Sequence, residues 1–206
     1  MKKRKGVIMQ YKVFEPDIEV NGSTVYSVIA GLGYFTNLSR RYFSRVNIGT
    51  VVNKELRIDL DGWYPQHAWL EAFKNIAEQI GDRVLFRIGL SVPENAQFPP
   101  WVVDIDTAIK AIDVAYHLNH RKNGAPLFDI NAGTMIEGVG HYGYERSRDG
   151  KNQIISVSHN PYPCAFDLGL ITAMAHKFQP NALVKHDDAK ECRSHGAETC
   201  TYNITW

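Results

Sequence analysis

Residues 186–206 read HDDAKECRSHGAETCTYNITW and carry the strongest structural signal in the chain. Cys192 and Cys200 stand eight residues apart, and Gly196 between them allows the chain to turn. After Cys200 polar and apolar residues alternate to the last residue, which predicts a half-buried final strand. Two cysteines on a short turn that leads into a strand are typical of a metal-binding clip.

The third cysteine, Cys164, follows a loop rich in proline and aromatic residues and is predicted to begin a helix. Three thiolates and one further ligand are enough for a closed tetrahedral zinc site, which would be structural. Four side chains could supply that ligand, and we take the first as the leading candidate: Asp188, His186, Glu191 and His195. The alternative is that Cys164 is a small buried apolar residue and the other two cysteines are idle thiols or a labile disulfide.

The second half of the chain has the pattern of a sheet with helices packed on it. Strand candidates with apolar residues in alternation span residues 138–145, 153–158 and 181–185. Apolar residues at helical spacing predict helices over residues 104–120 and 164–178. These elements predict an α+β fold, with an antiparallel sheet of about four or five strands packed by helices.

The first hundred residues predict an additional helical part. We expect a strand at residues 7–14, a helix from Ser23 or Thr24 to about Val46, and a helix that begins near Pro65 and ends before Gly81. The apolar run at residues 84–92 fits either a helix or a strand. We expect residues 1–206 to form a single domain, with 1–100 as the helical N-terminal part and 101–206 as the core.

Two glycines stand inside the first predicted helix. Gly31 and Gly33 would each weaken it by about 1 kcal/mol relative to alanine. Their presence indicates that another backbone approaches this helix closely, such as that of a second subunit. We therefore expect a homodimer that forms through the N-terminal helices.

Composition excludes several classes of protein. The formal net charge of +1 argues against a nucleic-acid binder, which needs a face that neutralises phosphates. No apolar stretch approaches the length of a membrane span, and polar residues interrupt any signal-peptide core near the N-terminus. An odd count of three cysteines fits a reducing compartment. We expect a cytoplasmic protein.

One part of the sequence resembles a known family. Residues 160–169, NPYPCAFDLG, followed by the cysteine pair and the final strand, resemble the 4-vinyl reductase domain. The resemblance covers residues 100–206 well and the first hundred weakly. It implies the ligand-binding fold that this family shares with nitric-oxide sensor domains and with the core subunits of a Golgi tethering complex.

Two branches of the family imply different ligands. In phenol-sensing activators the domain is a receptor with a zinc site of three cysteines and one glutamate beneath an aromatic pocket. Cys164, Cys192 and Cys200 match those cysteines in order, but Ala189 stands where the family has its glutamate. The other branch is linked to bacteriochlorophyll synthesis, in which a tetrapyrrole is handled.

Aromatic residues outnumber polar anchors in the regions that could form a pocket, as is usual for sites that bind small apolar ligands. The predicted ligand-binding residues are Trp101, Tyr116, His117, Tyr142 and Tyr144. We expect His117 or a tyrosine of the 142–144 strand to meet the polar group of the ligand, with His120 and His141 as further anchors. The alternatives are that the aromatic residues only fill the core, and that His117 is exposed at the end of its helix.

The sequence offers little support for catalysis. It has no glycine-rich phosphate loop and no nucleophile elbow, and Gly31-Leu32-Gly33 lacks the third glycine of a dinucleotide site. We expect a sensor or carrier for a hydrophobic aromatic or tetrapyrrole ligand. With no output domain in this chain, a sensor would signal through a separate protein. The alternatives are an enzyme that acts on a tetrapyrrole vinyl group and a protein-interaction scaffold.

Overall fold

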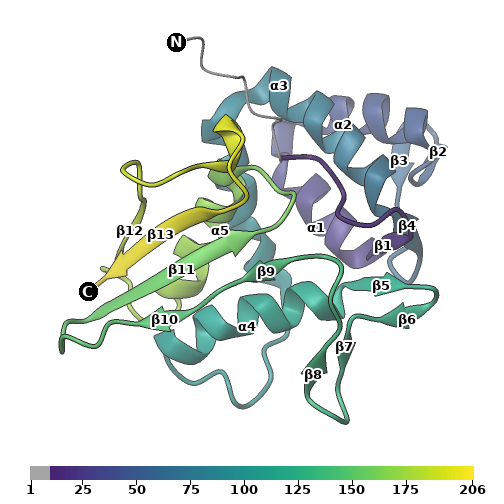
Figure 1. Ribbon diagram of the computed structural model, residues 1–206. Helices are drawn as coiled ribbons and strands as arrows, with labels where there is room; N and C mark the ends of the chain where they lie inside the picture. Colours follow the sequence, from purple (N-terminus) through teal and green to yellow (C-terminus); the bar gives the residue numbers. More distant parts are fainter. Residues whose placement is uncertain (1–9) are drawn as a thin grey trace, which may run out of the picture.

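An antiparallel sheet formed by the second half of the chain organises the structure (Figure 1). The computed structural model describes residues 10–206. In the sheet β11 pairs with β9 and β10 along one edge and with β13 along the other, and β13 also pairs with β12. The five strands are β9 (His141–Tyr142), β10 (Glu145–Arg146), β11 (Gln153–His159), β12 (Leu183–His186) and β13 (Cys200–Thr205). The predicted fold class and antiparallel sheet are confirmed.

Alternation along the strands decides which face of this sheet is buried. Ile154 lies opposite Ile204, and Ser156 lies opposite Tyr202, so these side chains share one face. All four are buried, whereas Val157 on the other face is exposed. The buried face receives α5 (Cys164–His176), as the sequence predicted.

Two glycines allow α5 to cross α3 (Gln66–Ser91) with the backbones in contact. A side chain at Gly89 would collide with the carbonyl oxygen of Phe166, and one at Gly169 would collide with that of Phe86. The helix α4 (Ile105–Leu118) packs on α5 and β9, and the capping box of Asp104 and Thr107 fixes its first turn. This confirms the helix predicted for residues 104–120.

The helix that begins after Pro65 ends before Gly81, as predicted, and a second helix follows directly within α3. Gly81 forms the bend between the two, with φ of 70°, and the second helix continues to Ser91. A positive φ is accessible to glycine at little cost, so the bend needs this residue. The ambiguous run at residues 84–92 is therefore helical, except for its last residue.

The single helix predicted from Ser23 or Thr24 to Val46 is wrong. The chain forms α1 (Gly22–Gly31), the 3₁₀ turn η1 (Gly33–Phe35), α2 (Thr36–Phe43) and the 3₁₀ turn η2 (Ser44–Val46). The side chain of Asn21 caps α1 by accepting from the backbone N–H of Ser23. Gly31 does meet another backbone closely, since a Cβ there would lie 3.3 Å from the Cα of Ile88. That backbone belongs to α3 of the same chain, so the homodimer stays a prediction.

A second antiparallel sheet joins the two halves of the chain, and the sequence did not predict it. Its order is β4–β1–β5–β6, with β1 (Ile18–Asn21), β4 (Trp63–Pro65), β5 (His120–Lys122) and β6 (Ala125–Pro126). The strand predicted at residues 7–14 is absent from the part that the structure describes, residues 10–14; residues 7–9 lie outside the described residues.

The remaining elements are short. They are the hairpins β2 (Thr50–Val52)–β3 (Glu55–Arg57) and β7 (Phe128–Asp129)–β8 (Thr134–Met135) and the 3₁₀ turns η3 (Val92–Asn95) and η4 (Arg193–His195). None of the helices within residues 10–206 combines the length and the apolar character needed to cross a membrane.

Candidate metal centre and ligand cavity

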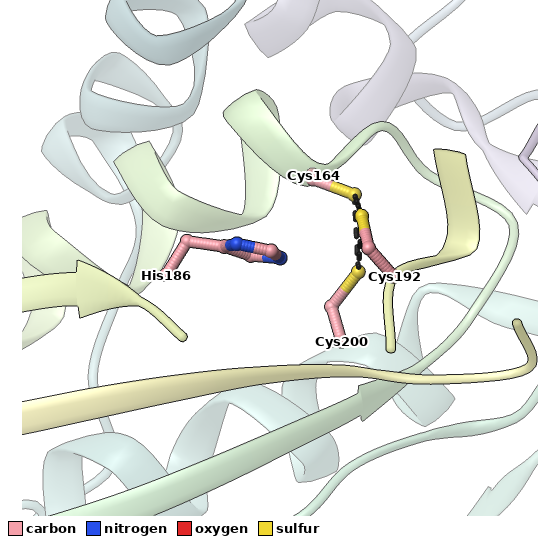
Figure 2. Close-up of side chains that lie close together, drawn as sticks. All are labelled: Cys164, His186, Cys192 and Cys200. Carbon is pink, nitrogen blue, oxygen red and sulfur yellow. Dashed lines mark hydrogen bonds between the residues drawn. The ribbon is translucent and has the colours of Figure 1, made fainter. Parts of the chain in front are cut away.

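The three cysteines converge from three different elements (Figure 2). Cys164 is the first residue of α5, Cys192 immediately precedes η4, and Cys200 is the first residue of β13. The Sγ atom of Cys164 lies 3.4 Å from that of Cys192 and 3.0 Å from that of Cys200, and the other two lie 3.6 Å apart. Sulfur atoms around a tetrahedral zinc ion stand about 3.8 Å apart, so small outward shifts would suffice to hold one.

His186 completes this group. It is the last residue of β12 and pairs with Tyr202, and this register puts it on the face of the sheet that also carries Cys200. One ligand atom from each of the four residues lies within 4.8 Å of the others. In Figure 2 the imidazole points toward the sulfur atoms.

The hydrogen bonds of His186 leave one ring nitrogen free to bind a metal. Nδ1 lies 2.9 Å from a carboxylate oxygen of Asp188, while Nε2 is buried and has no hydrogen-bond partner among the described residues. A carboxylate on one nitrogen of a histidine commonly orients the other toward a metal. Three thiolates and an imidazole are a donor set of structural zinc sites, so this cluster could bind a metal such as zinc.

The leading sequence candidate for the fourth ligand, Asp188, lies outside this group of four. Its side chain is 95% exposed and contacts His186. Glu191 and His195 line the surface hollow beside the cysteines and are likewise outside the group. The geometry favours His186 as the ligand and Asp188 as the residue that orients it.

Several donors surround the sulfur atoms. The side-chain amide of Gln10 donates to Cys164 at 2.8 Å, and the backbone N–H and Nε of Arg193 each lie 3.4 Å from Cys200 Sγ. The pKa of the Cys200 thiol is lowered by its hydrogen bond with Cys164 and, against the opposing effect of burial, by the charge of Arg193. The same bond, together with burial, raises the pKa of the Cys164 thiol. Cys200 is therefore the first of the pair to ionise.

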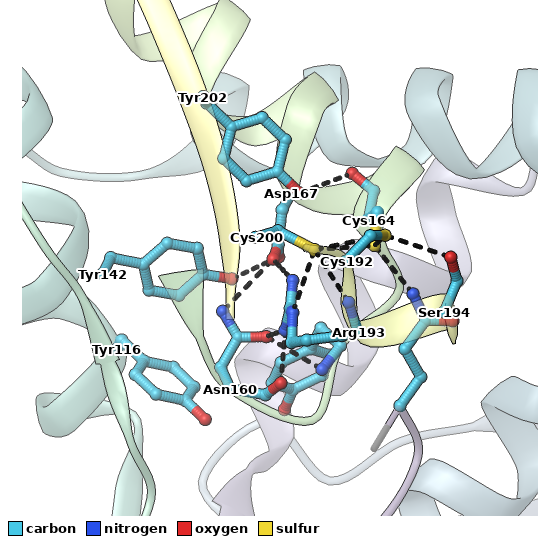
Figure 3. A network of polar contacts seen from close by, with 12 residues as sticks. Tyr116, Tyr142, Asn160, Cys164, Asp167, Cys192, Arg193, Ser194, Cys200 and Tyr202 are labelled. Carbon is cyan, nitrogen blue, oxygen red and sulfur yellow. Dashed lines mark hydrogen bonds and ion pairs between the residues drawn. The ribbon is translucent and has the colours of Figure 1, made fainter. Parts of the chain in front are cut away.

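A buried polar network connects the cysteines to the interior (Figure 3). Arg193 forms an ion pair with Asp167 and donates to the backbone and side-chain oxygens of Asn160. The hydroxyl of Tyr142 donates to the other oxygen of Asp167 at 2.7 Å. Burial has the largest single effect on the pKa of Arg193 and lowers it, but Asp167, Tyr202 and Cys200 together outweigh burial and raise this pKa. Sequence reasoning missed this network, since charged residues are seldom fully buried.

A cavity of about 400 Å³ lies among α1, α3, α4 and α5. Most of its walls are apolar side chains, among them Val28, Trp69, Phe98, Ile112, Phe166, Leu170 and Met174. Polar groups come from Tyr116, His120, Tyr142 and Tyr162. Because Tyr142 also bonds Asp167, the wall of the cavity is joined to the network that reaches Cys200.

One chain of hydrogen bonds fixes the polar groups on the cavity wall. Nδ1 of His120 lies 2.7 Å from the carbonyl oxygen of Tyr116, which can only accept, so Nδ1 carries the proton. Nε2 of His120 then accepts from the hydroxyl of Tyr162 at 3.1 Å, and that hydroxyl accepts from Nε1 of Trp69 at 3.2 Å. Burial lowers the pKa of His120 to about 4, so the ring is neutral near pH 7.

Of the five predicted ligand-binding residues, three line the cavity: Trp101, Tyr116 and Tyr142. Tyr144 is not among the lining residues; its hydroxyl donates to Asp106 and its ring packs on Lys110. His117 is also outside the lining and is fully buried, so it is not an exposed residue at the helix end. The ligand-binding roles of all five stay predictions.

The fold is shared with H-NOX domains of known structure. An oxygen-binding H-NOX domain related to soluble guanylate cyclases has 14% sequence identity and a TM-score of 0.57, with 90% of this chain and 94% of that chain covered. An H-NOX protein from S. oneidensis in the Fe(II)NO ligation state has 16% identity and a TM-score of 0.54, with 88% and 97% covered. At such identity the likeness establishes the fold alone.

No protein-family model matches this chain, and no curated protein matches its sequence. The structural likeness agrees with the ligand-binding fold that the 4-vinyl reductase resemblance implied, since that fold includes nitric-oxide sensor domains. Membership of the 4-vinyl reductase family itself stays a prediction.

Proposed function

We propose that this protein binds a small hydrophobic ligand, aromatic or tetrapyrrole, in the cavity among α1, α3, α4 and α5, and acts as a sensor or carrier. The observation that carries the proposal is an apolar cavity of about 400 Å³ with the His120–Tyr162 pair on its wall. Ligand sites of small molecules have volumes of about 300–1,000 Å³ and combine apolar walls with a few placed polar groups.

The polar chain on the cavity wall supplies the selectivity. Trp69, Tyr162 and His120 are already paired with one another, so a purely apolar ligand leaves none of these three groups unsatisfied. A ligand with a hydroxyl group gains a further bond if it donates to the Tyr162 hydroxyl, which has one lone pair left after it donates to His120 and accepts from Trp69. Trp101 and Phe98 provide aromatic surface on the same cavity.

The tetrapyrrole alternative draws on the fold. A solved structure with a TM-score of 0.56 to this chain is described in terms of heme redox potential and porphyrin distortion. The likeness is one of fold, so the choice of a tetrapyrrole as ligand depends on the residues of the cavity.

In this proposal a structural zinc ion is held by Cys164, Cys192, Cys200 and His186. It would join the start of α5 to the ends of β12 and β13 and so fix elements that are distant in sequence. Closed coordination by four protein ligands leaves no position for a substrate, so metal removal should destabilise the fold rather than stop a reaction.

The absorption spectrum and calorimetry of the purified protein test the proposal. A Soret-type band supports a tetrapyrrole, whereas a colourless protein that binds phenols with measurable heat supports an aromatic ligand. Leu170→Trp, which fills the cavity, should abolish binding. Leu168→Trp is the matched control, because Leu168 is also half-buried on α5 but does not line the cavity. A protein that binds neither class and co-purifies with partner proteins would instead be a scaffold.

The proposal also covers the cellular compartment, the oligomeric state and the partner of the protein. We propose a cytoplasmic homodimer that passes its signal to a separate output protein. Light scattering that shows a strict monomer at high concentration would remove the dimer from this account.

A further inference from the structure

A second cluster of potential metal ligands lies on α4 and β9, away from the cysteines. Asp113 and His117 stand four residues apart on α4, one turn of helix, and therefore share a face. His141 on β9 lies beside them, with Nδ1 3.0 Å from Asp113 Oδ2 and its ring centroid 4.8 Å from that of His117. One ligand atom from each of the three residues lies within 4.8 Å of the others.

The tautomer of His117 leaves a lone pair without a partner. Nδ1 lies 2.8 Å from the backbone carbonyl oxygen of Asp113, which can only accept, so Nδ1 carries the proton. In the neutral ring Nε2 is then the acceptor, and it is buried with no hydrogen-bond partner among the described residues. A buried acceptor without a partner costs about 1–3 kcal/mol. A bound cation would remove this cost, and a carbonyl on Nδ1 is a usual companion of metal-binding histidine.

The carboxylates of the cluster also lack strong cationic partners. Asp113 contacts His117 and His141, and Glu137 contacts Nε2 of His141 at 3.1 Å. Within residues 10–206, no lysine or arginine forms an ion pair with either carboxylate. The backbone N–H of Tyr142 donates to Asp113 Oδ1 at 2.9 Å and holds this carboxylate in place.

We infer that Asp113, His117 and His141 form a site for a divalent transition-metal ion such as Zn²⁺, Co²⁺ or Fe²⁺, with Glu137 as the residue that orients His141 through Nε2. Imidazole and carboxylate are the donors that these ions share, and a site of two histidines and one carboxylate leaves positions open to water. Asp113 and His141 already stand at the separation of two ligands on one ion, about 3.3 Å at usual bond lengths.

The site is separate from the cysteine cluster but adjoins the cavity. Its residues come from α4 and β9, whereas those of the cysteine cluster lie on or beside α5, η4, β12 and β13. Tyr116 and Tyr142, the neighbours of His117 and His141 in the chain, line the cavity. A metal ion here would therefore lie close to the wall that the ligand contacts.

Cobalt addition to the protein as isolated, followed by elemental analysis and absorption spectroscopy, tests the inference. We expect the wild type to hold one more equivalent of metal than His141→Ala, because His141 is a ligand and its side chain is 34% exposed, which makes the substitution mild for folding. Cobalt at this site should show weak visible bands without the near-ultraviolet charge-transfer band of a cobalt–thiolate bond. His67→Ala, which removes an exposed histidine on α3, should hold as much metal as the wild type.

The outcomes separate this site from the cysteine cluster. Equal metal content in wild type and His141→Ala overturns the inference, and so does a wild type in which every bound cobalt gives a thiolate band. Metal that is lost in His141→Ala, in a protein that shows no thiolate band, supports this site, and zinc found by elemental analysis of that protein would mean that the cysteines already hold a metal that cobalt does not displace.

Discussion

Arg193 and Asp167 form an ion pair in which neither side chain is exposed to solvent. The pair connects the cysteine cluster to the ligand cavity. Arg193 also donates to Cys200, and Asp167 also accepts from Tyr142 on the cavity wall. A change in the charge or position of Cys200 therefore has a direct hydrogen-bonded route to the cavity.

Substitution of Asp167 by Asn should strongly destabilise the protein. It leaves the buried guanidinium of Arg193 without its counter-charge, and the loss of one partner of a buried pair costs about 3–5 kcal/mol. Denaturant unfolding followed by circular dichroism measures the free energy of unfolding. Asp149→Asn is the matched control, since the pair of Asp149 and Lys151 is exposed and should contribute far less to stability than the buried pair. Equal costs for the two variants would contradict a buried, paired charge.

The fourth zinc ligand can be identified by comparison of two neighbours. His186→Ala removes a ligand, so we expect it to lose the zinc that copurifies with the wild type. Asp188→Asn only removes the residue that orients His186, so its zinc affinity should fall about 10- to 100-fold. Competition with a chromogenic chelator measures both affinities. The reverse order would make Asp188 the ligand, as the sequence first suggested.

Loss of the Tyr162 hydroxyl should weaken binding of hydroxylated ligands. Tyr162→Phe leaves Nε1 of Trp69 and Nε2 of His120 without a partner, so we also expect a loss of about 1–3 kcal/mol in stability. If a phenol donates to the Tyr162 hydroxyl, its affinity should fall about 10- to 100-fold in calorimetry. His117→Ala serves as the comparison, because His117 is one of the anchors predicted from the sequence but lies outside the cavity lining. A larger loss in His117→Ala than in Tyr162→Phe would restore His117 as the anchor.

Acid should destabilise the fold through His120. Its pKa in the folded protein is lowered from 6.5 to about 4, so the unfolded chain binds the proton more readily. The contribution of His120 to stability is complete above pH 6.5 and is lost as the pH falls toward 4, by roughly 3 kcal/mol in total. His120→Gln cannot titrate and should flatten this part of the profile. The same slope in both proteins between pH 6.5 and 4 would assign the acid sensitivity to another group.

The sequence was sufficient for the parts of the fold that depend on local pattern. Cysteine identity, the alternation after Cys200 and the helical spacing of apolar residues over 104–120 are local signals, and each led to the right element. The break at Gly33 was missed although its φ of 53° is one that glycine adopts readily. The pairing of β1 with β5 was missed because about a hundred residues separate the two strands.

In the candidate sites, too, local sequence patterns identify some residues, and contacts between distant parts of the chain determine the others. The three cysteines could be grouped from the sequence, but the choice between His186 and Asp188 depends on the register of β12 with β13, which puts His186 opposite Tyr202. Arg193 gave no signal, because a charge beside a glycine turn is normally exposed. Its burial depends on Asp167 and Asn160, which lie 26 and 33 residues away in the chain.

A native mass spectrum of the protein as isolated, compared with that of Leu170→Trp, tests the ligand-binding proposal most directly. The account predicts a bound organic molecule of defined mass in the wild type and in Leu168→Trp, and its absence in Leu170→Trp, where the new side chain occupies the cavity. A wild type that carries no organic ligand, and gains none when phenols or tetrapyrroles are added, would contradict the proposal.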